Sequence, residues 1–301
     1  MICAPRRWRP AARRCPLRPN RKLAALLLVC ILLGGMAYFT VSVLHLIMQL
    51  AVNSACDLMQ LKINAAVTAA TARSWSALDV LQGVRFRAPM ILLGGARIYD
   101  AERRKILFEQ TLPEQSAAAA LHRLRDAGLS PLIYTQNARD EQKIYYEDGA
   151  DEALRGYVSQ ETSGGDNRFA RAERLEERFG EKLFYLTARG EEGKLRPIVE
   201  ALKEQGIYAH LYFDVRRADI CCIEVCAVSK AEGVRQLRRI TGAERIVAFG
   251  DNGNDRELFA AAEERIAVGN ARPELKAMAN CVIGENESDA VVRTILEREG
   301  L

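Results

Sequence analysis

An apolar segment that runs straight into an acidic turn constrains this 301-residue chain more than any other feature. Residues 245–249 (RIVAF) have the composition of a buried strand, and a turn rich in glycine and asparagine follows with two aspartates, Asp251 and Asp255. In an open α/β sheet, the side chains at the carboxyl ends of strands converge on the crevice where ligands bind. The sequence therefore predicts an α/β fold with an acidic site at one edge of its sheet.

The residue types in this turn favour a metal and phosphate site. Carboxylate oxygens suit Mg²⁺, which binds through carboxylates together with substrate phosphate and water. We therefore predict Asp251 and Asp255 as metal ligands and Mg²⁺ as the cofactor. Asn254 begins a predicted helix, whose N-terminal dipole favours anions. Lys230 precedes another predicted helix, and it either offers a cation to the same crevice or is an ordinary solvated charge.

The wider pattern predicts a Rossmann-like, mostly parallel sheet core with an inserted α+β cap domain. The predicted core comprises residues 61–100 and 219–301, and the predicted cap comprises residues 101–218. Predicted strands of the core lie at 63–69, 89–93, 219–227, 245–249, 265–268 and 281–283. Predicted helices of the core lie at 75–81, 231–241, 254–262, 273–278 and 289–298. The cap is predicted to hold strands with one exposed face and amphipathic helices, the first of them at 114–127.

The first 60 residues differ from the rest of the chain. Residues 1–56 contain no Asp or Glu, and residues 1–22 are rich in arginine. Residues 23–44 are uncharged and long enough to cross a bilayer, and their basic flank fits a cytoplasmic N-terminus. Three interpretations stay open: a transmembrane segment that associates the protein with a membrane, an aberrant start that replaces a soluble one, and a targeting or buried core segment.

Charge and cysteine content argue against other kinds of site. The net charge of +4 comes from the basic N-terminal segment, so nothing indicates a nucleic-acid surface. Three cysteines at 221, 222 and 226 fall in an apolar strand pattern, which is typical of small buried thiols in a reducing compartment. We therefore expect a cytoplasmic α/β domain. The histidines, at positions 45, 122 and 210, are expected to be structural or surface residues.

An ordered set of motifs resembles the Cof-type phosphatases of the haloacid dehalogenase-like (HAD) superfamily over roughly residues 62–301. The segments that carry the resemblance are AVTAATARSW (66–75), PMILLGGARIYD (89–100), AVSKAEGVRQL (227–237), IVAFGDNGNDRELF (246–259) and AVGNARPELKAMANCVI (267–283). Lys230 matches the third-motif lysine of the family, and Asp251 and Asp255 match the fourth-motif acids. Thr71 stands in the place of the phosphate-binding hydroxyl of the second motif.

This resemblance implies a hydrolase that removes phosphate from a small phosphorylated metabolite by Mg²⁺-assisted phosphoryl transfer. It implies that Lys230, Thr71 and Asn254 bind the phosphate group. The family's first motif, Asp-x-Asp-Gly-Thr, supplies the nucleophile and is not found, because the nearest segment by position, residues 31–35 (ILLGG), has neither carboxylate. We therefore expect little or no turnover by the chain as written. The alternative is a membrane-anchored, catalytically inactive relative that binds a phosphorylated ligand or a partner.

Four residues of the predicted cap have two interpretations. Tyr134, Tyr145, Tyr146 and Arg139 either line a substrate pocket or pack within their strands, as aromatic residues in strands commonly do. No pattern in the sequence indicates an oligomeric state or the identity of the substrate.

Overall fold

The computed structural model describes residues 25–29, 66–74, 86–137, 139, 141–214 and 220–299, and of residues 25–29 and 153 only the backbone. The strands are β1 (Ala25–Val29), β2 (Ala66–Ala69), β3 (Met90–Leu92), β4 (Arg97–Asp100), β5 (Lys105–Glu109), β6 (Leu132–Gln136), β7 (Gln142–Glu147), β8 (Phe169–Ala172), β9 (Lys182–Gly190), β10 (Ala209–Phe213), β11 (Cys221–Cys226), β12 (Arg245–Gly250), β13 (Glu264–Ala267) and β14 (Cys281–Val282). The α-helices are α2 (Glu114–Asp126), α3 (Glu152–Ser163), α4 (Glu192–Glu204), α5 (Lys230–Thr241), α6 (Arg256–Ala260), α7 (Pro273–Met278) and α8 (Ala290–Glu299). Short 3-10 helices are η3 (Leu93–Gly95), η4 (Leu175–Arg178) and η5 (Gly253–Asp255).

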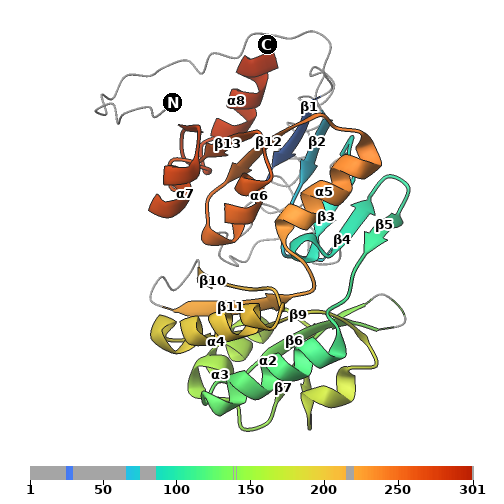
Figure 1. The fold of residues 1–301 in the computed structure, drawn as a ribbon, viewed down its shortest axis with the longest axis vertical. Coiled ribbons are helices and arrows are strands. Elements are labelled where there is room, and N and C mark those ends of the chain that lie inside the picture. The colour runs from blue at the N-terminus through green and yellow to red at the C-terminus, as the bar shows by residue number, and fades with distance from the viewer. Residues whose placement is uncertain are drawn as a thin grey trace.

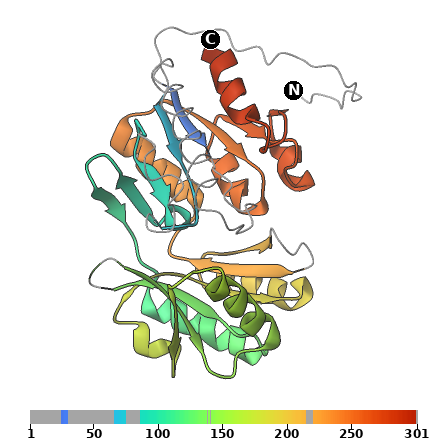
Figure 2. The same cartoon turned by 180° about the vertical axis from the view of Figure 1, so that it is seen from behind.

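A five-stranded, all-parallel sheet in the order β14-β13-β12-β1-β2 forms one half of the molecule (Figure 1). Successive side chains of a strand point to opposite faces, so each face needs its own cover. On β12, Ile246 and Ala248 pack in the apolar cluster that includes residues of α5 and α6. Val247 and Phe249 pack in a second cluster with Ile295 of α8, which covers the opposite face (Figure 2).

A smaller antiparallel sheet of β3, β4 and β5 lies beside this core. A parallel bridge between Ala70 and Ile91 joins it to the end of β2. The backbone of the loop after β2 is therefore held against β3.

A six-stranded mixed sheet in the order β10-β11-β9-β6-β7-β8 forms the other half of the molecule. Helices α2 and α4 share one apolar cluster with this sheet, through residues such as Leu121 and Leu195. Helix α3 contributes Leu154 and Val158 to a different cluster and lies on the opposite face (Figure 2). The predicted fold class, a Rossmann-like and mostly parallel core with an inserted α+β cap, is confirmed.

Strand β11 differs from the sequence-based assignment. The apolar run at 219–227 was predicted to belong to the core, but β11 pairs antiparallel with β9 and β10 in the six-stranded sheet. All six of its residues are buried, because α4 packs against one face and Cys226, on the other face, lies in an apolar cluster with Met90 and Leu92 of β3. Burial on both faces is the pattern of a core strand, which is why the sequence alone misplaces it. The other predicted domain boundaries remain predictions.

The N-terminal predictions fall largely outside the described residues. Within the predicted membrane segment 23–44, residues 25–29 form the strand β1, which pairs in parallel with both β12 and β2. In the part of the chain that the structure describes, no helix has the length and apolar character needed to cross a membrane. The predicted helix at 75–81 and His45 also lie outside the described residues.

Candidate active site

The turn after β12 folds its two aspartates back against the end of the strand. A Cβ on Gly250 would lie 2.9 Å from the Cβ of Asp255, so glycine at this position allows the close approach. The Asp251 amide donates to Asp255 Oδ2 at 3.2 Å, and the Asn252 side chain accepts from the Gly253 amide at the start of η5. The local sequence thus fixes both carboxylates at the edge of the parallel sheet.

Lys230 begins α5 and reaches the same turn. Its Nζ lies 2.7 Å from Asp255 Oδ1, and the two side chains are only 7% and 1% exposed. Ser229 caps the helix by accepting from the Glu232 amide. The burial of Lys230 excludes its alternative interpretation as an ordinary solvated charge. A buried lysine requires such a partner, since an unpaired charge away from water is costly.

Asp251 has an unsatisfied acceptor at this site. Its Oδ1 atom is buried and finds no hydrogen-bond partner among the described residues. Burial and the neighbouring Asp255 carboxylate raise the pKa of Asp251 to about 7. A carboxylate in this position is stabilised by a cation, and two carboxylates with an unused oxygen fit the ligand preference of Mg²⁺.

Thr71 lies in the loop after β2, which is bonded to the loop after β3. The Thr71 amide donates to Ile91 O at 2.9 Å, and the Gly94 amide donates to Thr71 O at 3.1 Å. The Thr71 hydroxyl accepts from the Arg73 amide at 3.1 Å. A Cβ on Gly95 would lie 2.2 Å from Ser229 O, so only glycine lets this loop touch the start of α5. The loop of Thr71 is therefore connected, through the loop after β3, to the helix of Lys230.

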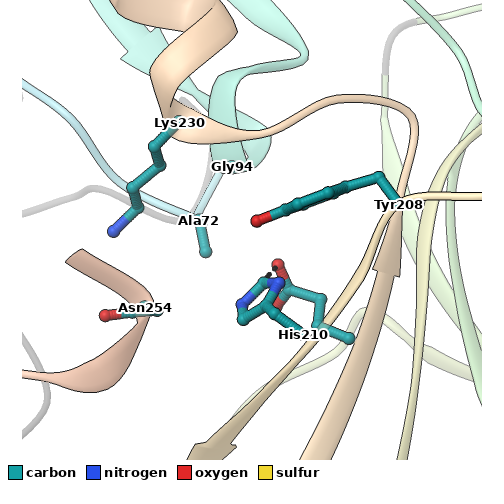
Figure 3. A pocket seen from close by; sticks show the side chains of 7 residues that line it. Ala72, Gly94, Tyr208, His210, Lys230 and Asn254 are labelled. Atoms are coloured by element: carbon teal, nitrogen blue, oxygen red, sulfur yellow. Dashed lines mark ion pairs between the residues drawn. The ribbon is translucent and has the colours of Figure 1, made fainter. Parts of the chain in front are cut away.

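A pocket opens where these loops face the six-stranded sheet. Its empty volume is about 230 Å³, and its lining residues are Ala72, Gly94, Tyr208, His210, Glu224, Lys230 and Asn254. Figure 3 shows Lys230 and Asn254 on one side, Tyr208 and His210 on the other, and Ala72 between them. Of the predicted site residues, Lys230 and Asn254 line this pocket. Thr71 is next in sequence to Ala72. Asp255 is not among the lining residues but contacts Lys230, which is.

Comparison with known proteins places the chain in a family. The model of the haloacid dehalogenase-like hydrolases matches residues 57–295. This chain belongs to the haloacid dehalogenase-like hydrolase family. The resemblance to HAD phosphatases found in the sequence motifs is thereby confirmed.

Similar HAD proteins include two curated phosphatases and a solved structure. A pyridoxal phosphate phosphatase of Escherichia coli is 48% identical over 17% of this chain and 19% of its own length. A phosphoglycolate phosphatase of Sulfurisphaera tokodaii is 40% identical over 22% of this chain and 30% of its own length. The chain thus spans less than a third of either relative. A HAD phosphatase structure from Bacteroides thetaiotaomicron is similar in fold, with 17% identity and a TM-score of 0.72 over 95% of this chain and 99% of that one.

Of the segment where the family's first motif is expected, the structure describes only the strand β1. This strand lies between β12 and β2, and Val29 stands level with Phe249, two residues before Asp251. Residues 31–35, the nearest segment to the missing nucleophile motif, lie outside the described residues. The sequence before Asp57 contains no Asp or Glu.

Sequence reasoning missed the three pocket residues that this HAD chain draws from its six-stranded sheet. Tyr208 directly precedes β10, and its ring centroid lies 5.6 Å from that of His210. His210, on β10, pairs in register with Glu224 on β11. His210 was expected to be structural or on the surface, yet it lines the pocket. One feature of the sequence indicated a functional residue here: Glu224 is the single charged residue in the otherwise uncharged run CCIEVC.

The cap aromatics singled out from the sequence do not line the pocket. Tyr134 stacks on Tyr185 with ring centroids 4.2 Å apart, and the Tyr145 hydroxyl donates to Glu181 at 3.0 Å. For Tyr134 and Tyr145, packing is the interpretation that the structure supports, whereas Arg139 is exposed.

Proposed function

We propose that this chain is a HAD-type phosphohydrolase in architecture, which binds a small phosphorylated metabolite together with Mg²⁺. In this proposal Lys230, Thr71 and Asn254 bind the phosphate group, and Asp251 and Asp255 are the metal ligands. The observation that carries it is the buried Lys230–Asp255 pair beside the unsatisfied Asp251 Oδ1, at the carboxyl end of the central strands. The two curated relatives, which act on pyridoxal phosphate and phosphoglycolate, support a small phosphate ester as ligand.

The residues have distinct roles. The Lys230 ammonium, held in place by Asp255, supplies a fixed positive charge for the phosphate oxygens. Asn254 is the second residue of η5 and offers its side-chain amide to the same group. When bound at the two aspartates, Mg²⁺ would neutralise negative charge on the phosphate. The six-stranded sheet closes the pocket from the other side and limits the access of water to the site.

Turnover is a separate question from binding in this chain. The family reaction needs a nucleophilic carboxylate from the first motif. Since no acidic residue occurs before Asp57, we propose that hydrolysis by this chain is impaired while ligand binding is kept. The division into a core (61–100 and 219–301) and a cap (101–218) is part of the proposal, with the last boundary moved to Ala227, after β11.

Calorimetric titration of inorganic phosphate into the full chain, with and without Mg²⁺, tests this function. We expect phosphate binding that Mg²⁺ strengthens, and a loss of affinity of roughly ten- to hundredfold in Lys230→Ala, because a hydrogen bond to a charged group is removed. Lys194→Ala is the matched control, since Lys194 is exposed on α4 and is not among the residues that line the pocket. An assay of the same preparations with an aryl phosphate is expected to give turnover near background.

Two results would contradict the proposal. The first is a folded chain, judged by circular dichroism, that binds neither phosphate nor Mg²⁺. The second is phosphate binding that Lys230→Ala leaves unchanged.

A further inference from the structure

The pocket has a second polar end, opposite Lys230, built by the six-stranded sheet. Glu224 comes from β11 and is 9% exposed, and its Oε1 lies 4.0 Å from His210 Nε2. The Cys226 thiol donates to the same Oε1 at 3.0 Å. Tyr208 directs its hydroxyl into the space between this end and Lys230 (Figure 3). The two ends belong to different halves of the molecule, with the pocket between them.

The space in front of Glu224 is kept open by a glycine of the core. Gly94 has φ +66°, and a Cβ placed on it would lie 3.5 Å from Glu224 Oε1. Any side chain at position 94 would therefore stand against this carboxylate. Because residue 94 is a glycine, no side chain stands between the Glu224 carboxylate and the backbone at this position.

Three side chains near Glu224, those of His210, Cys226 and Tyr208, are neutral. Burial lowers the pKa of His210, so its ring is uncharged at neutral pH, and both ring nitrogens lack a hydrogen-bond partner among the described residues. Burial raises the pKa of the Cys226 thiol well above its ordinary value. Burial and the Glu257 carboxylate raise the pKa of Tyr208, so its hydroxyl keeps its proton. Among the residues that line the pocket, Glu224 and Lys230 are thus the charged ones, at opposite ends.

We infer that Glu224 selects the organic part of the ligand: it accepts a hydrogen bond from a hydroxyl or amino group and disfavours a carboxylate in the same place. This inference rests on the proposed function, because it assumes that the phosphate group binds at the Lys230 end. A buried acceptor that loses its partner is costly, whereas a donor on the ligand satisfies it. A second negative charge beside Glu224 is repelled strongly, because the two charges are close together and little water screens them. The Cys226 thiol holds Glu224 through its hydrogen bond to Oε1, and His210 and Tyr208 complete the polar lining of the pocket.

A matched pair of ligands tests the inference. Glycerol 3-phosphate and 3-phosphoglycerate differ in a terminal CH₂OH against a carboxylate, and both are titrated calorimetrically into the full chain with Mg²⁺. We expect glycerol 3-phosphate to bind roughly ten- to hundredfold more tightly, the range of a hydrogen bond to a charged group. In Glu224→Gln, which keeps the shape of the side chain, the ratio should fall to within about threefold. Inorganic phosphate should bind both proteins equally.

A second variant guards against a folding defect in the first. Gly94→Asn leaves Glu224 in place and puts an amide beside its Oε1, at a backbone conformation that asparagine tolerates. It should weaken the preference for glycerol 3-phosphate in the same direction.

The outcomes separate this inference from the proposed function. If the wild-type chain binds inorganic phosphate through Lys230 but shows no preference between the two esters, or if its preference survives in Glu224→Gln, the inference is wrong and the proposed function stands. If the chain binds no phosphate at all, the proposed function fails and the inference falls with it.

Discussion

At the scale of single residues, the Lys230–Asp255 pair dominates the site. Both side chains are almost fully buried, and each satisfies the other at 2.7 Å. The desolvation free energy of two buried charges is large and offsets most of their attraction, so such a pair adds little stability. Removing one partner is nevertheless strongly destabilising. Its burial beside a pocket is consistent with a functional role for the ammonium.

Asp255→Asn should destabilise the chain by roughly 3–5 kcal/mol, the usual cost of removing one partner of a buried ion pair. The reason is that Lys230 would keep its charge in a buried place without the Asp255 carboxylate. Urea denaturation followed by circular dichroism measures the change in unfolding free energy. The exposed pair Arg293–Asp289 provides the control, and Asp289→Asn should change stability by less than about 1 kcal/mol.

The double variant Lys230→Met with Asp255→Leu sharpens this test, because it removes both charges together. It should be more stable than Asp255→Asn. A double variant that is less stable than either single change would show that the cost comes from packing and not from an unpaired charge.

At the scale of elements, the site depends on contacts between loops that no single segment determines. The loop that contains Gly95 touches the start of α5 at Ser229, the residue before Lys230. The same loop binds the backbone of Thr71 through Gly94. Two adjacent glycines, Gly94 and Gly95, therefore couple the second-motif loop to the helix that carries the lysine.

Gly95→Ala should destabilise the chain and also lower its affinity for phosphate. At φ +110° the new Cβ would lie 2.2 Å from Ser229 O, so both backbone strain and displacement of α5 are expected. Strain of this kind costs roughly 1–3 kcal/mol. Gly128→Ala is the control, since Gly128 has φ +71° but an open surrounding, and its change should leave phosphate affinity unaltered. Equal effects of both changes on phosphate binding would refute the coupling.

Sequence patterns predicted some elements well and others poorly, for identifiable reasons. The helices predicted at 231–241 and 273–278 form α5 and α7 with nearly the same bounds, since each combines an apolar stripe with clear end signals. Helix α3 was not predicted, because Gly156, two serines and a threonine lower its intrinsic propensity. It is held by Leu154 and Val158 packing on the six-stranded sheet, which the local sequence does not reveal.

At the scale of the whole molecule, the pocket is shared between two sheets. The core provides Lys230, Asn254 and the second-motif loop, and the six-stranded sheet provides Glu224 and His210. Arg97 of β4 also joins the halves, because its buried guanidinium donates to Glu109 on β5 and to Gln136 on β6. The arrangement allows one half to bind phosphate while the other contacts the rest of the ligand.

The division of the pocket between two sheets also explains which of its residues the sequence could predict. Lys230, Asp251, Asn254 and Asp255 follow directly from strand and helix ends along the chain, so their convergence was predictable. Glu224 and His210 meet only through the antiparallel register of β10 and β11, which depends on the burial of these strands against α4. The sequence alone does not determine that register.

The central claim is that Asp251 and Asp255 form a divalent-cation site beside the phosphate-binding lysine. The most direct test is a crystal structure of the chain grown with Mn²⁺ and phosphate, with the metal located by its anomalous scattering. We expect an anomalous peak at about 2.0–2.5 Å from carboxylate oxygens of Asp251 and Asp255, with phosphate between the metal and Lys230 Nζ. A metal found instead at His210, Glu224 and Cys226, whose ligand atoms lie within 4.8 Å of one another, would contradict it.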